Sequence, residues 1–380
     1  MSFDLSKRFT QLLFVLILTL SIGLQWYGHW YGLLLTSDSY QYLSAAQSFK
    51  TNGVFLSPDG SYYTYWPPLF PVILSLFNNP EYALIWINVL VKIAIGFLIF
   101  FLAHEFLKRN IVKVLFVLVS LCAVQIIMIS VFLWSELIFL FLFLLAISAA
   151  LRMKSSGYFM LMLASLFLMC LKRNAGAFLV PAFSVWMMID TSLLLKERIK
   201  KGVIIFIIGI AGLCFWNAYV SLFIPSNFYF YRHEFFTEFP SNFSMISETI
   251  ARCFLPISGM LATFFGFIMF LVLIWSLKID SYRTKQSQLI SLLVLFYLLG
   301  FMAMGKLDVY EMDRYLSVIV PLVYLLFFML IENSYNRLKT LSHQRILIAI
   351  LVLGMIYPMV RTLKNTRLWN ERSYSSDTSK

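Results

Sequence analysis

Apolar runs of about 18 residues or more recur from one end of the chain to the other. Each run is long enough to cross a hydrocarbon core of about 30 Å as a helix. The runs are continuous rather than alternating, and backbone groups in lipid must be bonded internally, so the runs predict helices and not barrel strands. Only 13% of the 380 residues are charged, against roughly 25% in soluble domains. The sequence therefore predicts an all-α polytopic membrane protein.

We expect about eleven transmembrane helices, which form a single transmembrane domain over residues 1–380. The first run is too long for a cleavable signal and lacks a small-residue cleavage site, so it should stay as an anchor. The fifth and sixth runs are short. The predicted spans are 9–35, 82–107, 111–128, 133–151, 158–171, 176–189, 203–224, 254–277, 289–304, 316–331 and 346–360.

The placement of Lys and Arg predicts a topology with the N-terminus inside. Inner segments then hold 17 of the 30 Lys and Arg residues, whereas outer segments before the C-terminal tail hold 7. The net charge of +12 is spread over short inner loops, which argues against nucleic acid and favours membrane lipids as partners. We expect an integral multi-pass protein, in the cytoplasmic membrane if the protein is bacterial, with an active site that faces outward.

Two segments outside the spans are long enough to build a site, namely outer loop 1 (36–80) and outer loop 2 (225–252). In outer loop 1, apolar residues recur at helical spacing, which predicts an interfacial helix with Asp38 or Ser39 as its N-cap. A second short helix should follow Pro67-Pro68. Outer loop 2 is rich in Phe and acidic residues, and it is suited to covering the site and recognising an acceptor.

The opening of the chain resembles GT-C type glycosyltransferases, which include protein O-mannosyltransferases and the enzyme that adds aminoarabinose to lipid A. The shared order is a first span, an Asp soon after it, an interfacial helix, a Tyr-rich turn and Pro-Pro-Leu before the second span. It is carried by Asp38, Ser39, Tyr40, Tyr65, Trp66, Pro67, Pro68, Leu69 and Pro71. Similar later stretches are Trp134-Ser135-Glu136, Lys172-Arg173-Asn174-Ala175-Gly176 and Asp313-Arg314-Tyr315-Leu316 with Pro321.

The resemblance implies transfer of a sugar from a polyprenyl-phosphate carrier to a lipid, glycan or protein acceptor on the extracytoplasmic face. This chemistry needs a carboxylate to take the acceptor's proton and cations to hold the phosphate. We expect Asp38 to be the base and Glu136 to support it. Arg suits phosphate because its planar fork donates two parallel hydrogen bonds. The expected substrate-binding residues are Tyr40, Tyr65, Trp66, Lys172, Arg173, Arg314 and Tyr315.

Each of these residues also has a purely structural interpretation. Asp38 could act only as an N-cap, Glu136 could only stabilise a helix start, and the arginines could only anchor helices at the headgroups. Some relatives of the GT-C type carry a Lys just before Pro-Pro for the carrier phosphate, whereas this chain has Trp66 there. The phosphate partner must then come from elsewhere in the chain.

Lys92 supports an alternative function, because it falls near the middle of its span, where ionisable residues are rare. It could mark a pathway in a transporter or flippase for a lipid-linked or small substrate, or it could be buried against Asn88, Gln125 or a carbonyl. No paired halves of the kind found in inverted-repeat carriers are evident. A polysaccharide polymerase or ligase is disfavoured because outer loop 1 has Lys50 as its single basic residue. The sequence requires no cofactor and leaves a divalent metal open.

Overall fold

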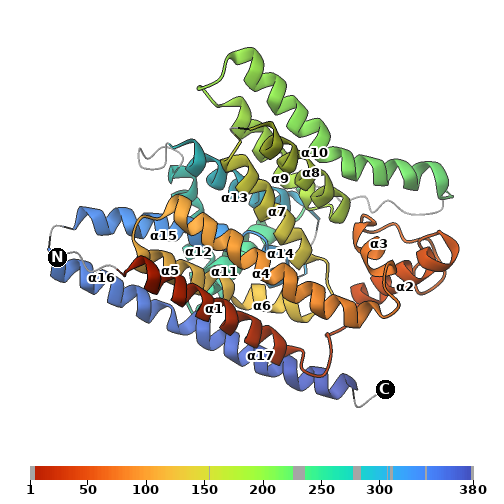
Figure 1. The fold of residues 1–380 in the computed structure, drawn as a ribbon, viewed down its shortest axis with the longest axis horizontal. Helices are drawn as coiled ribbons and strands as arrows, with labels where there is room; N and C mark the ends of the chain where they lie inside the picture. The colour runs from red at the N-terminus through yellow and green to blue at the C-terminus, as the bar shows by residue number, and fades with distance from the viewer. Residues whose placement is uncertain are drawn as a thin grey trace.

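The computed structural model describes residues 5–153, 155–225, 236–276, 284–305, 307–308, 311–338 and 340–377. Within these ranges the regular structure is helical, with two isolated β-bridges (Figure 1). The helices are α1 (Lys7–Gly28), α2 (Ser37–Asn52), α3 (Leu69–Ser75), α4 (Pro80–Phe106), α5 (Asn110–Leu121), α6 (Val124–Val131), α7 (Glu136–Leu151), α8 (Ser156–Lys172), α9 (Gly176–Met188), α10 (Leu195–Phe223), α11 (Phe239–Arg252), α12 (Gly259–Ser276), α13 (Lys285–Ala303), α14 (Met312–Leu316), α15 (Val320–Arg337), α16 (Leu341–Gly354) and α17 (Ile356–Asp377).

The helices confirm the predicted class of all-α polytopic membrane protein. In the described ranges, five stretches are long and apolar enough to cross a membrane: α1, α4, α10, α13 and the Leu341–Ser373 stretch of α16 and α17. The number becomes six if the bent α5–α6 pair is counted as one span. Helices α7, α8, α9 and the Gly259–Val272 part of α12 are apolar but shorter.

The predicted span 111–128 is not one straight helix, which corrects the sequence analysis. It consists of α5 and α6, which meet at an angle of 41°. Hydroxyl groups from neighbouring helices bond the carbonyls at the break, since Ser21 Oγ donates to Leu121 O at 2.6 Å and Thr362 Oγ1 donates to Cys122 O at 2.8 Å. These bonds replace helical ones inside a bundle where water is scarce.

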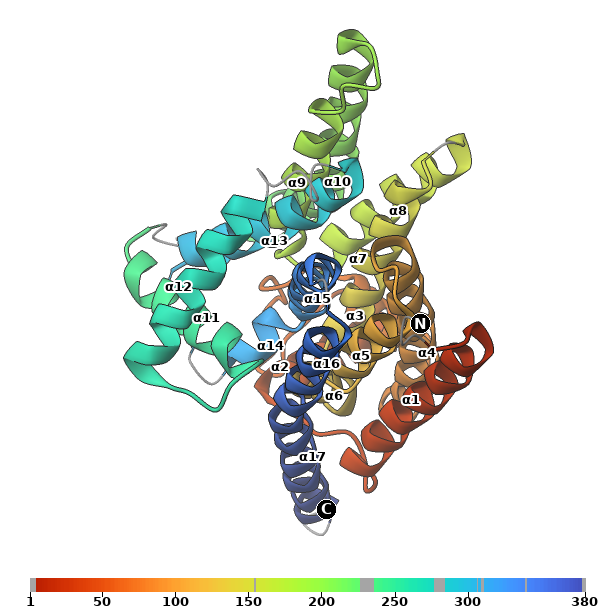
Figure 2. The same cartoon turned by 90° about the vertical axis from the view of Figure 1, so that its left-hand side faces the viewer.

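Helix α7 lies at the centre of the bundle, where it packs against α4 and α8 (Figure 2). Its residues are apolar almost all around the helix and nearly all are buried, as expected for a core helix. The pairing of α10 with α8 and α9 depends on small residues. A Cβ atom added at Gly212 of α10 would lie 2.3 Å from Phe167 O of α8, so only Gly permits this approach.

Outer loop 1 folds at one end of the bundle, at the right of Figure 1, and contains both predicted interfacial helices. The N-cap of α2 is Thr36 rather than Asp38 or Ser39, because the backbone N–H of Thr36 donates to Ser39 Oγ at 2.9 Å and so starts the helix earlier. Asp38 therefore lies in the first turn, where its side chain is available for other contacts. Helix α2 ends at Gly53, whose φ of 71° is left-handed.

Outer loop 2 is only partly described, since residues 226–235 fall outside the described ranges. Tyr229, Tyr231, Arg232, His233 and Glu234, which belong to the loop expected to cover the site and recognise the acceptor, lie in that segment. The remainder of the loop is α11, whose Asn242 side chain is fully buried. Its Nδ2 donates to the carbonyls of Met304 at 2.9 Å and Gly305 at 3.2 Å. Helix α11 thus holds the chain where it leaves α13.

Candidate active site

A pocket with about 460 Å³ of space free of protein atoms lies where outer loop 1 meets the α8–α9 and α13–α14 connections. Five of its seven lining residues were predicted as site residues from the sequence. A second pocket of about 580 Å³ between α11, α12, α13 and α15 has no ionisable residue in its lining, so chemistry is assigned to the first. The first pocket is lined by Asp38, Trp66, Arg173, Asp308, Glu311, Arg314 and Tyr315.

Asp38 and Glu136 are brought together by main-chain bonds between two distant segments. The backbone of Leu34, which leads into α2, bonds to the segment between α6 and α7: Leu34 N donates to Val131 O at 3.1 Å, and Leu133 N donates to Leu34 O at 3.0 Å. Ser39 Oγ also donates to Leu133 O at 3.0 Å. The first turn of α2 is thereby fixed beside the first turn of α7.

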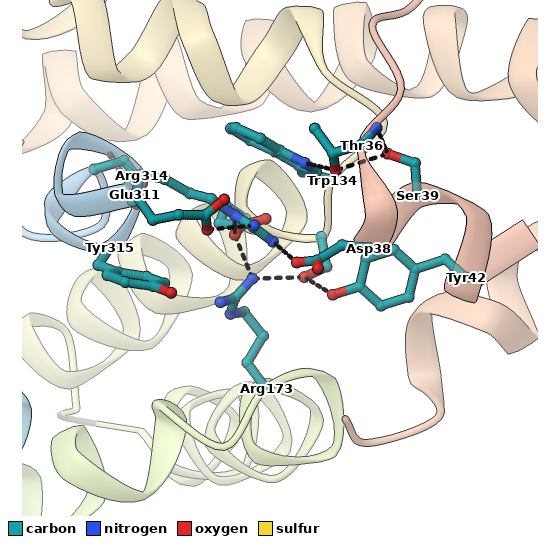
Figure 3. Close-up of polar contacts among 12 residues, drawn as sticks. Thr36, Asp38, Ser39, Tyr42, Trp134, Arg173, Glu311, Arg314 and Tyr315 are labelled. Carbon is teal, nitrogen blue, oxygen red and sulfur yellow. Dashed lines mark hydrogen bonds and ion pairs between the residues drawn. The ribbon is translucent and has the colours of Figure 1, made fainter. Parts of the chain in front are cut away.

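Arg314 is the centre of the charged groups in the pocket (Figure 3). Its Nη2 lies 2.7 Å from Asp38 Oδ2, its Nη1 lies 2.7 Å from Glu311 Oε2, and its Nε donates to Glu136 Oε1. The guanidinium also lies 4.3 Å over the Trp134 ring, a cation–π contact. The Arg314 side chain is only 2% exposed, and it meets three carboxylates.

Glu136 links the two arginines. Its Oε1 lies 2.5 Å from Arg173 Nη1 and also accepts from Arg314 Nε. The same Arg173 Nη1 donates to Ser135 Oγ at 2.9 Å, and the hydroxyl groups of Ser135 and Tyr42 lie 3.4 Å apart. A buried carboxylate without a cation would be very costly, whereas here it fixes two guanidinium groups side by side. Figure 3 shows Arg173, just past the end of α8, and Arg314 of α14 approaching each other from different segments.

The surroundings shift the pKa values of the groups around the pocket. Burial alone would lower the pKa of Arg314, but the carboxylates of Glu136 and Asp38 outweigh burial and raise it, so this guanidinium stays charged. Arg173 shows the same balance, with burial opposed by Glu136 and a net rise in pKa. Burial raises the pKa of Glu311 despite the nearby Arg314. Burial also raises the pKa of Tyr315 to about 12, which leaves its hydroxyl neutral.

Three predicted substrate-binding residues do not line the pocket. The side chains of Tyr40 and Tyr65 are both 56% exposed on outer loop 1. Lys172 is 1% exposed, and its Nζ lies 3.7 Å over the Phe70 ring. Lys172 and Arg173 are neighbours at the end of α8, but only Arg173 reaches the pocket.

The structure adds Glu311 and Asp308 to the site, and the sequence analysis named neither. A signal for Glu311 was present, because it precedes Arg314 by three residues, a spacing that places two side chains on one face of a helix. Trp134 and Ser135 were noted only as part of a motif. Here Trp134 lies against the Arg314 guanidinium, and its Nε1 donates to Thr36 Oγ1 at 2.8 Å.

The carboxylates of the pocket are arranged for guanidinium groups. Asp38, Glu136 and Glu311 each contact Arg314. Among the described residues, no group of three or more His, Cys, Asp or Glu side chains is placed to hold a metal ion. This donor set does not fit a metal centre.

Lys92, the residue behind the transporter alternative, is fully buried on α4. Its Nζ donates to Ser130 Oγ at 3.3 Å, and Asn88 Nδ2 donates to Ser130 O at 3.3 Å. It lines neither of the two pockets described above. Burial beside Asn88, the second interpretation of this Lys, therefore matches the structure, although the bonded partner is Ser130.

Comparison with known proteins places the fold. No family model matches the chain, and no curated protein has a significantly similar sequence. Among solved structures, ArnT from Cupriavidus metallidurans bound to undecaprenyl phosphate matches with a TM-score of 0.59 and 14% identity, over 96% of this chain and 75% of that one. The oligosaccharyltransferase of Archaeoglobus fulgidus, in complex with Zn and sulfate, matches with a TM-score of 0.59 and 12% identity, over 93% of this chain and 53% of that one. Both are GT-C glycosyltransferases, and the chain has a GT-C-like fold.

Proposed function

We propose that the protein is a glycosyltransferase that moves a sugar from a polyprenyl-phosphate carrier to an acceptor hydroxyl on the extracytoplasmic face of the membrane. The observation that carries the proposal is a carboxylate, Asp38, that shares one pocket with two guanidinium groups, Arg173 and Arg314. Both structural neighbours are transferases of this general kind, and one is bound to undecaprenyl phosphate. A fold alone does not fix a function, so the site must carry the argument.

Asp38 is assigned as the general base. Its side chain is 20% exposed, so it can reach an incoming acceptor, and it lies in the first turn of a rigidly anchored helix. As the acceptor oxygen attacks the anomeric carbon, the hydroxyl proton passes to Asp38 Oδ. The bond between that carbon and the phosphate oxygen breaks, and its electron pair leaves with the lipid phosphate. Charges and atoms balance without any further reactant.

Arg173 and Arg314 are assigned to the phosphate. Charge-assisted hydrogen bonds from a guanidinium stabilise the negative charge that grows on the leaving oxygen. Glu136, bonded to both, positions them without having to touch the substrate. This arrangement supplies the phosphate partner that Trp66 cannot supply in place of the Lys found in some relatives.

Aromatic side chains are assigned to the sugar and to the headgroup region. Trp66 and Tyr315 line the pocket and offer flat apolar faces for a sugar ring. Tyr40 and Tyr65, exposed on outer loop 1, are proposed to contact the acceptor or lipid headgroups. The apolar pocket between α11, α12, α13 and α15 offers a surface for part of the isoprenoid chain.

The decisive experiment supplies purified protein with radiolabelled polyprenyl-phosphate sugars and a membrane extract. We expect label to move from the carrier to a lipid, glycan or protein in the extract, and to remain on the carrier when Asp38 is replaced by Asn. No transfer from any carrier sugar tested would overturn the proposed function.

The outward orientation has its own test. A reporter fused after Lys50, in α2, should report an extracytoplasmic position, because the basic residues favour an inner N-terminus. A cytoplasmic signal at Lys50 would reverse the orientation, and with it the face on which transfer takes place.

A further inference from the structure

We infer that Asp313 and Arg361 are positioning residues that hold Arg314 in the pocket, so that the C-terminal helix α17 is part of the catalytic apparatus. This inference rests on the proposed function for its kinetic test but not for its structural test. It starts from the size of α14, which has five residues and carries Arg314. A helix this short has almost no stability of its own and must be held by neighbours.

Asp313 and Arg314 are consecutive residues of α14 with different partners. Arg314 bonds to Asp38, Glu136 and Glu311. Asp313 bonds away from the pocket, where Arg361 Nη2 of α17 lies 2.5 Å from its Oδ2 and Gln125 Nε2 of α6 donates to its Oδ1 at 2.7 Å. Both oxygens of the carboxylate are thus bonded to donors that belong to other helices. We call this group, Asp313 with Arg361 and Gln125, the α14 clamp.

The donors of the α14 clamp are themselves fixed. Arg361 Nη1 donates to the carbonyl of Arg252, at the end of α11, at 3.1 Å. Gln125 is 1% exposed, and its Nε2 lies 3.4 Å from Cys253 Sγ. The next residue after Arg361, Thr362, ties α17 to the α5–α6 break, because its Oγ1 donates to Cys122 O at 2.8 Å. The clamp therefore connects α14 to three helices, α17, α6 and α11.

Other contacts hold α14 against the bundle: Tyr297 OH of α13 donates to Tyr315 O at 2.7 Å, and the side chains of Met312 and Leu316 are buried. The clamp adds bonds to the residue directly before Arg314. Without them, a rotation of α14 would carry Arg314 away from Asp38 and Glu136. A misplacement of about 1 Å in a reacting group can cost on the order of 100-fold in rate, so the clamp matters for chemistry.

The kinetic test is a double-mutant cycle on α14 and α17. Arg361→Met should lower kcat/KM for the carrier by roughly 10- to 100-fold. In an Arg314→Lys background the same change should cost about twofold or less, because Arg361 acts through Arg314 and the effects cannot add. Additive losses would mean that Arg361 only supports the fold, and would overturn the inference.

The matched control is Arg367→Met, on the same helix. Arg367 is 75% exposed and pairs with Glu371 at 3.0 Å, so its loss should leave transfer unchanged. If Arg361→Met fails to accumulate, Asp313→Asn serves in the same cycle, since it keeps the shape of the side chain and removes the charge that Arg361 pairs with.

A structural readout separates this inference from the proposed function. Hydrogen exchange of peptides that cover Met312–Leu316 should become faster in Arg361→Met and stay unchanged in Arg367→Met, whatever reaction the protein performs. Unchanged exchange in Arg361→Met would overturn the clamp even in an active transferase. If the wild-type protein transfers no sugar, the proposed function fails, and the exchange result still decides the clamp.

Discussion

Two regions of the bundle bury cations, and they do so in opposite ways. In the pocket, Arg314 is 2% exposed and meets the carboxylates of Asp38, Glu136 and Glu311. Around Lys92, which is fully buried, the nearest bonded group is the neutral hydroxyl of Ser130 at 3.3 Å. Arg314 lines a pocket, whereas Lys92 lines neither of the two pockets described above.

The difference shows what makes a buried charge useful. An ammonium near the bilayer centre costs roughly 2.5–3.5 kcal/mol on insertion scales, and that cost alone proves no function. Opposite charges with access to a substrate can do chemistry, because their fields act on whatever enters. The pocket is therefore the proposed functional region, Lys92 is assigned to the architecture, and mutation can test that contrast.

The largest expected effect is that of Asp38→Asn. Loss of the base should lower sugar transfer by about 100-fold or more, as measured with labelled carrier, while the protein stays inserted and abundant. Asp59→Asn is the matched control. Asp59 lies in the same outer loop, and its carboxylate accepts a hydrogen bond from a near neighbour in the chain, Ser61 N, at 3.0 Å. Full activity in Asp38→Asn would end the base assignment.

Glu136→Gln should damage both activity and stability. Removing one member of a buried ion pair costs about 3–5 kcal/mol, because the remaining charges lose their partner. We expect a lower melting temperature in detergent together with weaker transfer, since Arg173 and Arg314 would repel each other. A variant that melts and transfers like the wild type would contradict the linking role of Glu136.

Arg173→Ala and Arg314→Ala should act on the carrier rather than on the acceptor. Loss of one charge-assisted hydrogen bond to phosphate should raise the KM for the carrier by roughly 10-fold or more, with little change in the KM for the acceptor. Steady-state kinetics with each substrate varied in turn measures the split. Equal carrier affinity in both variants would remove the two arginines from the phosphate site.

The smallest expected effect is that of Lys92→Met. Transfer should stay at the wild-type rate, and the melting temperature should be equal or higher, because Met fills a similar volume without a buried ammonium. A large loss of transfer in a well-folded Lys92→Met protein would erase the contrast between the two regions and would revive a substrate pathway through α4.

Sequence reasoning recovered the class of fold because long apolar runs leave few alternatives in lipid. It missed the α5–α6 break because the apolar run continues through Cys122-Ala123 without Pro or Gly, and the bonds that stabilise the break come from Ser21 and Thr362, far away in the chain. Hydrogen bonds from such distant residues leave no local sequence signal of the helix break.

The candidate site was recovered in part. Asp38, Arg173 and Arg314 were selected by residue type and motif, and the structure brings them together. Lys172 was grouped with Arg173 because the two are adjacent, yet Lys172 is the last residue of α8 whereas Arg173, just after it, has an extended backbone, and of the two only Arg173 lines the pocket. The contacts of Glu136 were beyond reach, since nothing local in the sequence indicates that it pairs with two arginines from distant segments.

The bond between Arg314 and Asp38 has a consequence for the sequence of events in the proposed reaction. Asp38 Oδ2 lies 2.7 Å from Arg314 Nη2, so this oxygen is occupied while the guanidinium stays in place. In the proposed reaction, the carrier phosphate is the anion that would draw Arg314 away from it. Binding of the lipid-linked sugar before the acceptor would then make Asp38 Oδ2 available to the acceptor hydroxyl, and two-substrate kinetics would show a compulsory order with the carrier first.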